Sequence, residues 1–284
     1  MIMQASSSLA LREIVRFLRQ KNRVIGALAT PVIFWFLLGS GVGRSLASSG
    51  IRERADYLTY FFPGIVLLII LFTAIFSTVS VIEDRREGFL QGVLVAPDGR
   101  SAILFGKLIG GTLLAVFQAL IVVLIAPYTD YHPDARVLMY LVAMIALLAV
   151  GLTALGFLFA WPMDSTQGFH ALINLFFVPL WFLSGALFPA SGAAEWIRTL
   201  MRFNPLSYGH DALAGLLATR PGMPLPLDLS HDFSIVIAST LLLVMACAVQ
   251  VSRRSGPCRC RRRRDLSLPI DNLRRLSGLF WWWG

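Results

Sequence analysis

Charged residues are scarce in this sequence. Asp, Glu, Lys and Arg make up 14% of the 284 residues, whereas hydrophobic residues make up 56%. An average soluble domain has roughly 25% charged residues. So few ionisable side chains cannot cover the outside of a soluble fold of this length, so we expect lipid to surround much of the chain.

Cysteine and histidine are also scarce, with three and four residues. These numbers exclude a disulfide framework, and the histidines do not have metal-ligand spacing. Gly106-Lys107 is followed by Leu108, which is not the sequence of a phosphate-binding loop. No nucleophile motif and no series of intramembrane carboxylates occurs. We therefore expect a chain that is not an enzyme by itself and that binds no cofactor and no metal.

The positive charge is concentrated at one end of the chain. Residues 252–284 hold nine arginines and two aspartates, a net +7, so residues 1–251 account for only +2 of the total +9. A charge confined to one tail gives little support for a nucleic-acid partner, and we expect none. The tail 252–284 is predicted to be a separate, disordered or atypical cytoplasmic segment; its arginines could also bind anionic headgroups.

Long hydrophobic runs dominate the remaining sequence, residues 1–251. Stretches of about 18 or more residues with few or no charges are typical of transmembrane helices. Six occur, at approximately 24–42, 61–82, 102–126, 137–160, 168–188 and 233–251. The fold class predicted is therefore an all-α membrane protein with six transmembrane helices.

The distribution of lysine and arginine between the connecting segments predicts the orientation. The two termini and the second and fourth connections contain 18 of these residues, and the opposite side contains seven. Because the cytoplasmic side carries the excess, we expect both termini in the cytoplasm. The expected location is the inner (plasma) membrane.

The N-terminal segment is predicted to be an amphipathic helix. Its apolar residues repeat at helical spacing: Leu11, Ile14, Val15 and Leu18. Arg12, Arg16 and Arg19 point away from this stripe. We expect the helix to lie at the cytoplasmic interface, with its arginines on anionic headgroups.

The second connection contains a short predicted helix. Five consecutive charged residues, 83–87, end the second span, and Pro97 ends the helix. Between them lies an apolar stripe: Phe89, Leu90, Val93 and Leu94. Such a stripe beside charges favours docking against a partner; the alternative is that it packs on the membrane or on its own chain.

The connection between the fifth and sixth spans is unusually long. Residues 194–203 read as a helix at the outer interface, with four apolar residues on one face: Trp196, Ile197, Leu200 and Met201. Asn204-Pro205 then breaks this helix, and residues 208–217 begin another, with Asp211 near its N-terminal end.

Three segments of the chain together resemble the signature of ABC-2 type permeases, the membrane subunits of ABC exporters. They are Arg86-Glu87-Gly88-Phe89-Leu90-Gln91-Gly92-Val93-Leu94-Val95-Ala96-Pro97, Leu183-Ser184-Gly185-Ala186-Leu187-Phe188-Pro189 and Asn204-Pro205-Leu206-Ser207-Tyr208-Gly209-His210-Asp211-Ala212-Leu213. The resemblance covers roughly residues 8–250. Gln91, Asp98-Gly99 and Ala214 depart from the family pattern, which puts charge contacts at those positions in doubt.

The resemblance implies a function and two sites. The first site would be a coupling helix that contacts an ABC ATP-binding subunit through Arg86, Glu87, Phe89, Leu90, Val93 and Leu94. The second would be an external gate or re-entrant region at Asn204, Pro205, Tyr208 and Asp211. ATP and Mg²⁺ would be bound by the partner subunit, and the permease would form a homodimer or pair with a related permease. The transported substrate would be amphipathic, lipid-like, a drug or a saccharide.

Two other function classes remain as alternatives. A membrane-embedded lipid-modifying enzyme would need a cluster of Asp, His or Ser, for which Tyr208–Asp211 is the nearest candidate. An ion-coupled carrier would need intramembrane charge or an inverted pair of broken helices, and the sequence contains neither pattern.

Overall fold

The computed structural model describes residues 2–47, 54–94, 99–124, 134–188, 190–219 and 224–253. Within these ranges the chain is helical and has no strand. The tail from residue 254 onward and the expected helix end at Pro97 lie outside the described residues.

The helices follow the apolar segments of the sequence. In chain order the α-helices are α1 Ile2–Arg19, α2 Lys21–Ala47, α3 Arg54–Arg86, α4 Phe89–Leu94, α5 Gly99–Val123, α6 Ala135–Ala160, α7 Thr166–Leu172, α8 Val178–Trp181, α9 Glu195–Phe203, α10 Pro205–Ala218 and α11 Leu229–Arg253. Two π-helical segments, η2 Ile173–Phe177 and η3 Phe182–Ala186, continue α7 and α8, and a 3₁₀ turn, η4, covers Ala190–Gly192.

Five helices in the described part of the chain are long and apolar enough to cross a membrane. They are Tyr60–Arg86, Gly99–Val123, Ala135–Ala160, Thr166–Ala186 and Leu229–Arg253. These correspond to the second to sixth predicted spans, with boundaries that differ by a few residues. The first predicted span, 24–42, falls within α2, whose described apolar part is Val24–Leu37. That part is shorter than a full span, so the count of six stays a prediction.

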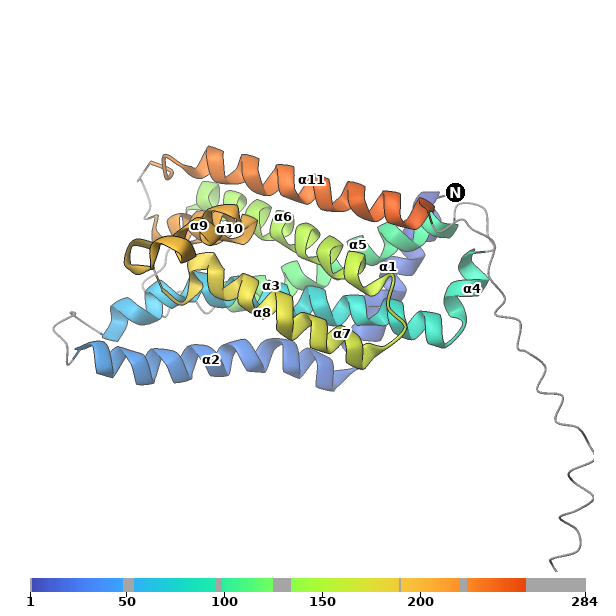
Figure 1. Ribbon diagram of the computed structural model, residues 1–284, viewed down its shortest axis with the longest axis horizontal. Coiled ribbons are helices and arrows are strands. Elements are labelled where there is room, and N and C mark those ends of the chain that lie inside the picture. The colour runs from blue at the N-terminus through green and yellow to red at the C-terminus, as the bar shows by residue number, and fades with distance from the viewer. Residues whose placement is uncertain are drawn as a thin grey trace, which may run out of the picture. The chain divides into compact units, whose positions relative to one another are not determined.

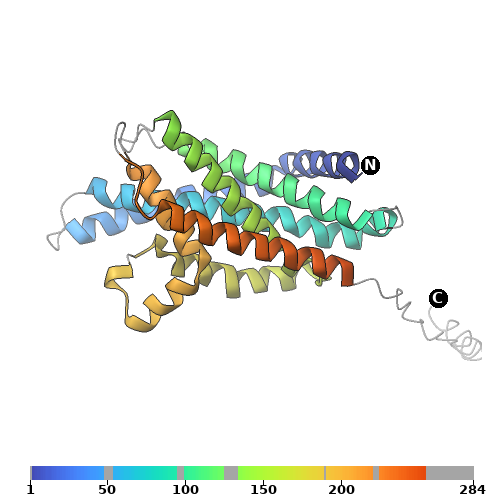
Figure 2. The same ribbon diagram turned by 90° about the horizontal axis from the view of Figure 1, so that it is seen from above.

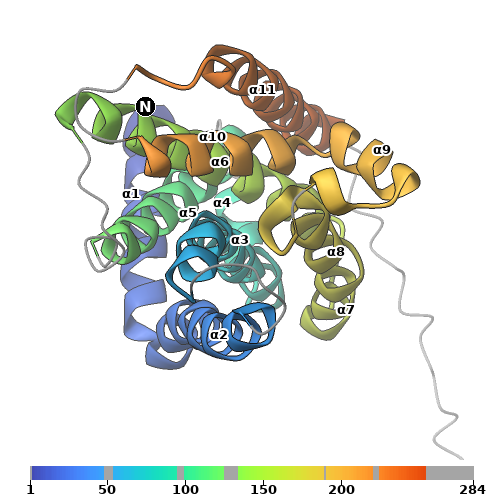
Figure 3. The same cartoon turned by 90° about the vertical axis from the view of Figure 1, so that its left-hand side faces the viewer.

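Helix α3 lies at the centre of the helical unit. Seen end-on, α2, α5, α6, α10 and the α7–α8 segment surround it, and α11 lies outside this ring (Figure 3). Figure 2 shows the same peripheral position of α11 from another side. In the most apolar part of α3, 89% of the residues are buried, whereas in α11 the share is 22%. Helix α3 therefore forms the core, and α11 leaves most of its apolar surface exposed to lipid.

The segments that contain the two predicted sites lie at opposite ends of this helical unit. Helix α4, the chain's N-terminus and the turn between α6 and α7 lie at one end, which we call the α4 end, whereas α9 lies at the other, the α9 end (Figure 1). The α4 end therefore contains the segments predicted to face the cytoplasm, and the α9 end contains the predicted external helices.

Helix α1 packs on α5 through a face that the sequence analysis did not single out. The buried residues of α1 are Ser6, Ala10, Glu13 and Phe17. The two backbones approach closely because α5 has glycine at the contact: a Cβ on Gly106 would lie 2.7 Å from Leu9 Cβ, and one on Gly110 would lie 3.0 Å from Glu13 Cβ. In the predicted apolar stripe of α1, Leu11, Val15 and Leu18 face outward with 63%, 41% and 49% exposure, whereas Ile14 packs on the small buried cluster around Phe17.

Candidate coupling site and the cavity at the opposite end

Helix α4 leaves α3 through a tight turn. The Glu87 N–H donates to the Glu83 carbonyl (2.9 Å), and Gly88 then adopts a left-handed conformation, φ 79°. Glycine accepts this conformation at little cost and commonly ends helices in this way. The Gln91 N–H donates to the Gly88 carbonyl (3.1 Å), which starts α4 at once. The turn thus holds the short helix directly beneath the end of α3.

The apolar stripe of α4 packs on its own chain. Leu90 is 3% exposed and belongs to the main hydrophobic core, on which Val93 and Leu94 also pack. Gln91 and Gly92 face outward together with Arg86 and Glu87 at the preceding turn. Of the six residues predicted to contact a partner, Leu90 is therefore buried, and the surface open to another protein is the polar edge of α4.

A buried charge network lies directly behind α4. The Lys107 Nζ donates to Glu13 Oε2 (2.5 Å), Asp84 Oδ2 (2.7 Å) and Ser80 Oγ (2.7 Å). All four residues are at most 7% exposed. Isolated buried charges are costly, so each of these ions needs its counterion in place. The network joins α1, α3 and α5 at one point.

Two arginines of α1 complete this network. Arg12 Nη2 donates to Asp84 Oδ1 (2.9 Å), and Arg16 Nη1 donates to the same oxygen (2.5 Å). Arg16 Nη2 also lies 3.1 Å from both Glu83 Oε2 and Glu87 Oε1. Burial would lower the pKa of Arg16, but the three carboxylates outweigh it and raise this pKa further.

These contacts correct the expectation for the N-terminal helix. Arg12 and Arg16 bind carboxylates of α3 and its C-terminal turn, not lipid headgroups, whereas Arg19 is exposed. The Arg12 guanidinium also lies 3.7 Å from the centroid of the Phe89 ring, a cation–π distance. Arg12 therefore connects the first residue of α4 to Asp84. Henceforth we call Arg12, Glu13, Arg16, Asp84 and Lys107 the charge network.

Sequence reasoning missed the central members of the charge network, Glu13 and Asp84. The available signal was weak: Glu13 is a lone acidic residue among arginines, and Asp84 is one of five consecutive charges. Lys107 stood out as a charge inside a predicted span, but its partners lie 94 and 23 residues away in the chain.

The turn between α6 and α7 is fastened to the same end. Arg85 donates to the carbonyl oxygens of Trp161 and Met163 and pairs with Asp164 Oδ1 (3.2 Å). Arg86 Nε donates to the Asp164 carbonyl (2.9 Å). The second and fourth connections, which the sequence assigns to one side of the membrane, are therefore in direct contact.

The predicted external gate surrounds a kinked helix at the α9 end. The segment α7–η3 is kinked at Gly185, which lies inside η3 and has a left-handed backbone with a φ of 89°. A kink of this kind leaves carbonyl groups without their helical donors, and in lipid these groups must be satisfied locally. Asn204 Nδ2 donates to the Leu180 carbonyl (2.8 Å), Ser207 Oγ to Leu183 (2.9 Å) and Tyr60 Oη to Gly185 (3.0 Å).

Helix α10 begins three residues earlier than predicted. Asn204 caps it, since its Oδ1 accepts from the Leu206 N–H (3.1 Å), and Pro205 occupies the first turn, where the ring is well tolerated. Asp211 therefore lies almost two turns inside the helix, not near its N-terminal end. The four predicted gate residues share this corner: Tyr208 Oη donates to the Arg202 carbonyl (2.9 Å), and Asp211 Oδ1 lies 3.4 Å from His210 Nδ1.

A cavity with several polar side chains in its lining opens between α3, α9, α10 and the kink. Its volume is about 360 Å³, and we call it the α9 cavity. Its polar lining comes from four elements: Tyr60, Ser184, Arg198, Arg202, Ser207, Tyr208 and Asp211. A space of this size is within the range of small-molecule sites.

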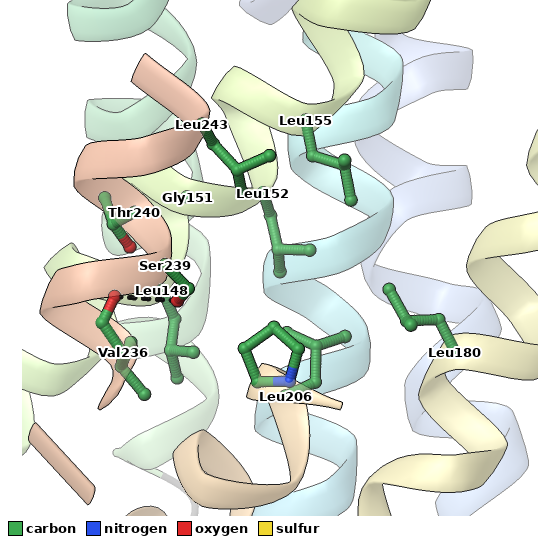
Figure 4. Close-up of a pocket in the computed structure, with 11 residues that line it drawn as sticks. Leu148, Gly151, Leu152, Leu155, Leu180, Leu206, Val236, Ser239, Thr240 and Leu243 are labelled. Atoms are coloured by element: carbon green, nitrogen blue, oxygen red, sulfur yellow. Dashed lines mark hydrogen bonds between the residues drawn. The ribbon is translucent and has the colours of Figure 1, made fainter. Parts of the chain in front are cut away.

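A second cavity lies beneath α11 and is apolar. It is lined by leucines of α6, α8, α10 and α11, and the hydroxyl of Ser239 is bonded to the carbonyl of Val236 in its own helix (Figure 4). Its volume of about 40 Å³ is a packing gap of little more than one water. It is too small for a transported molecule.

No group of three or more His, Cys, Asp or Glu residues that could hold a metal occurs in the described ranges. His210 and Asp211, the nearest candidate for an enzymatic pair, adjoin each other, and His210 Nε2 has no hydrogen-bond partner in the described part of the chain. The described geometry does not add a second catalytic cluster to them.

The described chain is a helical unit with the short helix α4 at one end and a capped, kinked corner at the other, and five of its helices are long and apolar enough to cross a membrane. The chain belongs to the ABC-2 type transporter family, whose model matches residues 4–217. It is 27% identical over 202 residues to a protein of Cyanophora paradoxa named as a transport permease, ycf38, covering 70% of this chain and 69% of that one.

Two bacterial relatives have more specific names. Nodulation protein J of Rhizobium leguminosarum bv. trifolii is 26% identical over 200 residues, 70% of this chain and 75% of its own length. YbhR of Escherichia coli K12, named as a multidrug ABC transporter permease, is 26% identical over 161 residues, 56% of this chain and 44% of its own length. The chain is thus a multi-pass transport permease component, and its family implies association with the membrane and with an ATP-binding subunit.

Proposed function

We propose that the chain is the permease subunit of an ATP-driven ABC exporter. It crosses the inner membrane six times with both termini in the cytoplasm and works as a dimer. A separate ATP-binding subunit holds ATP and Mg²⁺ and docks at the α4 end, and this chain has no ATPase site of its own. Its path carries an amphipathic substrate, which is lipid-like, a drug or a saccharide; the name of the multidrug relative supports the drug in this range.

The observation that carries the proposal is that α4 has one edge exposed and the other packed on the helical core. Its outer edge, Gln91 and Gly92, is open to a partner, while its inner edge packs on the core through Leu90. Phe89 contacts Arg12, and Arg12 is paired with Asp84. A push on α4 therefore reaches α1, α3 and α5 through the charge network.

This linkage supports a two-state mechanism. The ATP-binding subunit supplies free energy by binding one arrangement of the α4 end more tightly than the other. The charges in the network stay paired only when α1, α3 and α5 move together. Displacement of α4 therefore moves these three helices as a unit. The substrate path then changes from inward-facing to outward-facing.

A mutation on α4 tests docking only if it leaves the fold of this chain intact. Leu90→Asp would bury a carboxylate in the core, so that loss of coupling and loss of folding could not be separated. Gly92 is a better probe, because a Cβ there meets no atom within 4 Å. Gly92→Trp should leave this chain's fold intact and obstruct only a docked partner.

The experiment is co-purification of the full chain with its ATP-binding subunit, followed by measurement of ATP hydrolysis. We expect Gly92→Trp to reduce both by about tenfold, equivalent to roughly 1.4 kcal/mol of lost binding. The matched control is Gly192→Trp, where a Cβ also meets nothing within 4 Å; Gly192 belongs to η4, which lies between η3 and α9 in the chain and far from α4 in the sequence. If Gly92→Trp preserved co-purification and stimulated hydrolysis, docking at α4 would be wrong.

A further inference from the structure

Two arginines line the α9 cavity without a carboxylate partner. Arg198 and Arg202 are one helical turn apart on α9, and neither is within ion-pair distance of an acidic side chain of the described residues. Arg198 donates one hydrogen bond, to the Ala193 carbonyl (3.2 Å). Among the described residues that line the cavity, Asp211 is the one acidic residue, and it lies beside His210.

The other donors around the cavity are already used. The hydroxyls of Tyr60, Ser184, Ser207 and Tyr208 each donate to a backbone carbonyl. The guanidinium groups are therefore the donors that remain for a ligand. Guanidinium groups present several N–H donors in a planar array that matches the oxygens of phosphate and carboxylate groups.

The same short helix has an apolar side. Trp196, Leu200 and Phe203 are 67%, 45% and 82% exposed, and at 100° per residue they lie roughly opposite Arg198 and Arg202. Met201, at the edge of the predicted apolar face of Trp196, Ile197, Leu200 and Met201, is buried and lines the cavity. Helix α9 separates a cationic cavity from an exposed apolar surface.

We propose that the α9 cavity binds the anionic headgroup of an amphiphile, with the phosphate or carboxylate on Arg198 and Arg202 and the acyl portion passing around α9 to its apolar side, where Trp196, Leu200 and Phe203 lie. The cavity volume of about 360 Å³ accommodates a glycerophosphate-sized headgroup. This inference rests on the proposed function, because it makes the cavity the place where a transported anionic amphiphile is held at the α9 end. It narrows the substrate to amphiphiles with a negative headgroup.

The test measures ligand binding in the absence of the ATP-binding subunit. The headgroup proposal and the proposed docking at α4 can therefore fail independently of each other. The full chain in an uncharged maltoside detergent is titrated with short-chain phosphatidylglycerol, short-chain phosphatidylcholine and soluble glycerol phosphate, by microscale thermophoresis. We expect phosphatidylglycerol to bind roughly tenfold more tightly than phosphatidylcholine, because both lipids have the same phosphate but the choline cation is repelled by the two arginines. Glycerol phosphate should bind more weakly than phosphatidylglycerol.

The double variant Arg198→Gln, Arg202→Gln should remove this preference and leave the melting temperature unchanged. Arg136→Gln, which changes an exposed arginine in the first turn of α6 that does not line the cavity, should retain it. Absence of the preference in the wild-type chain, or its persistence in the double variant, would overturn the proposal. Equal, arginine-dependent binding of glycerol phosphate and phosphatidylglycerol would overturn the assignment to an amphiphile.

Discussion

The two ends of the molecule treat positive charge in opposite ways. At the α4 end Arg12, Arg16 and Lys107 are each paired with carboxylates, and Lys107 is 7% exposed. At the α9 end Arg198 and Arg202 are exposed around a cavity and have no carboxylate partner in the described part of the chain. Paired buried charges hold helices together, whereas unpaired accessible charges are available to a ligand. The four predictions below test this difference, from the largest expected effect to the smallest.

Removal of the central cation at the α4 end should have the largest effect. Lys107→Met leaves Glu13 without a counterion in the protein interior, and we expect a loss of about 3 to 5 kcal/mol in the free energy of unfolding. The measurement is denaturation by SDS in mixed micelles. The double variant Lys107→Met, Glu13→Gln should recover part of the loss, because Asp84 keeps Arg12 and Arg16. Equal stability of Lys107→Met and wild type would show that the network does not hold α1.

The corner at the α9 end depends on neutral hydrogen bonds and should be less sensitive. Asn204→Ala removes the cap on Leu206 and leaves the Leu180 carbonyl without its donor. We expect a loss of about 2 kcal/mol, from the cap and the unsatisfied carbonyl together. Asn204→Ser, which keeps a capping oxygen, should recover about half in the same assay. A loss as large as that of Lys107→Met would remove the contrast between the ends.

The two left-handed glycines provide a comparison in which the ends should behave alike. Gly88 and Gly185 have φ values of 79° and 89°, and a Cβ on either would meet no atom closer than 3.5 Å. Gly88→Ala and Gly185→Ala should each cost about 1 to 2 kcal/mol of unfolding free energy, from backbone strain alone. A much larger loss at one of them would show that backbone geometry, and not charge, distinguishes the ends.

The smallest change in stability is expected where the cations have no carboxylate partner. The double variant Arg198→Gln, Arg202→Gln should alter the free energy of unfolding by less than about 0.5 kcal/mol, as is usual for surface substitutions. Thermal melting in detergent checks this directly. Destabilisation by several kcal/mol would mean that these arginines are structural, as Lys107 is.

The sequence was sufficient for the long helices and insufficient for what joins them. Hydropathy located five spans within a few residues, because an uninterrupted apolar segment such as 137–160 has few alternatives to a membrane helix. The break predicted at Asn204-Pro205 is confirmed, because α9 ends at Phe203, but Asn204 also caps α10, so the predicted start of that helix at residue 208 is three residues too late.

The candidate sites could be predicted only in part, because their chemistry depends on distant segments. Leu90 has the local pattern of a docking residue, but the core of α3 and α5 covers it. Arg12 was assigned to headgroups because its partner, Asp84, is 72 residues away. A site at Arg198 and Arg202 could not be predicted, because the kink at Gly185 and helix α10, which form the cavity with them, are separate segments of the chain.

The central claim, that an ATP-binding subunit docks on the outer edge of α4, is tested most directly by site-specific photo-crosslinking in the assembled transporter. A photoreactive phenylalanine analogue is placed at Gln91 on that edge and, as a matched exposed position at the α9 end, at Phe203. The account predicts a covalent product with the ATP-binding subunit from Gln91 and none from Phe203. A product from Phe203, or none from Gln91, would contradict it.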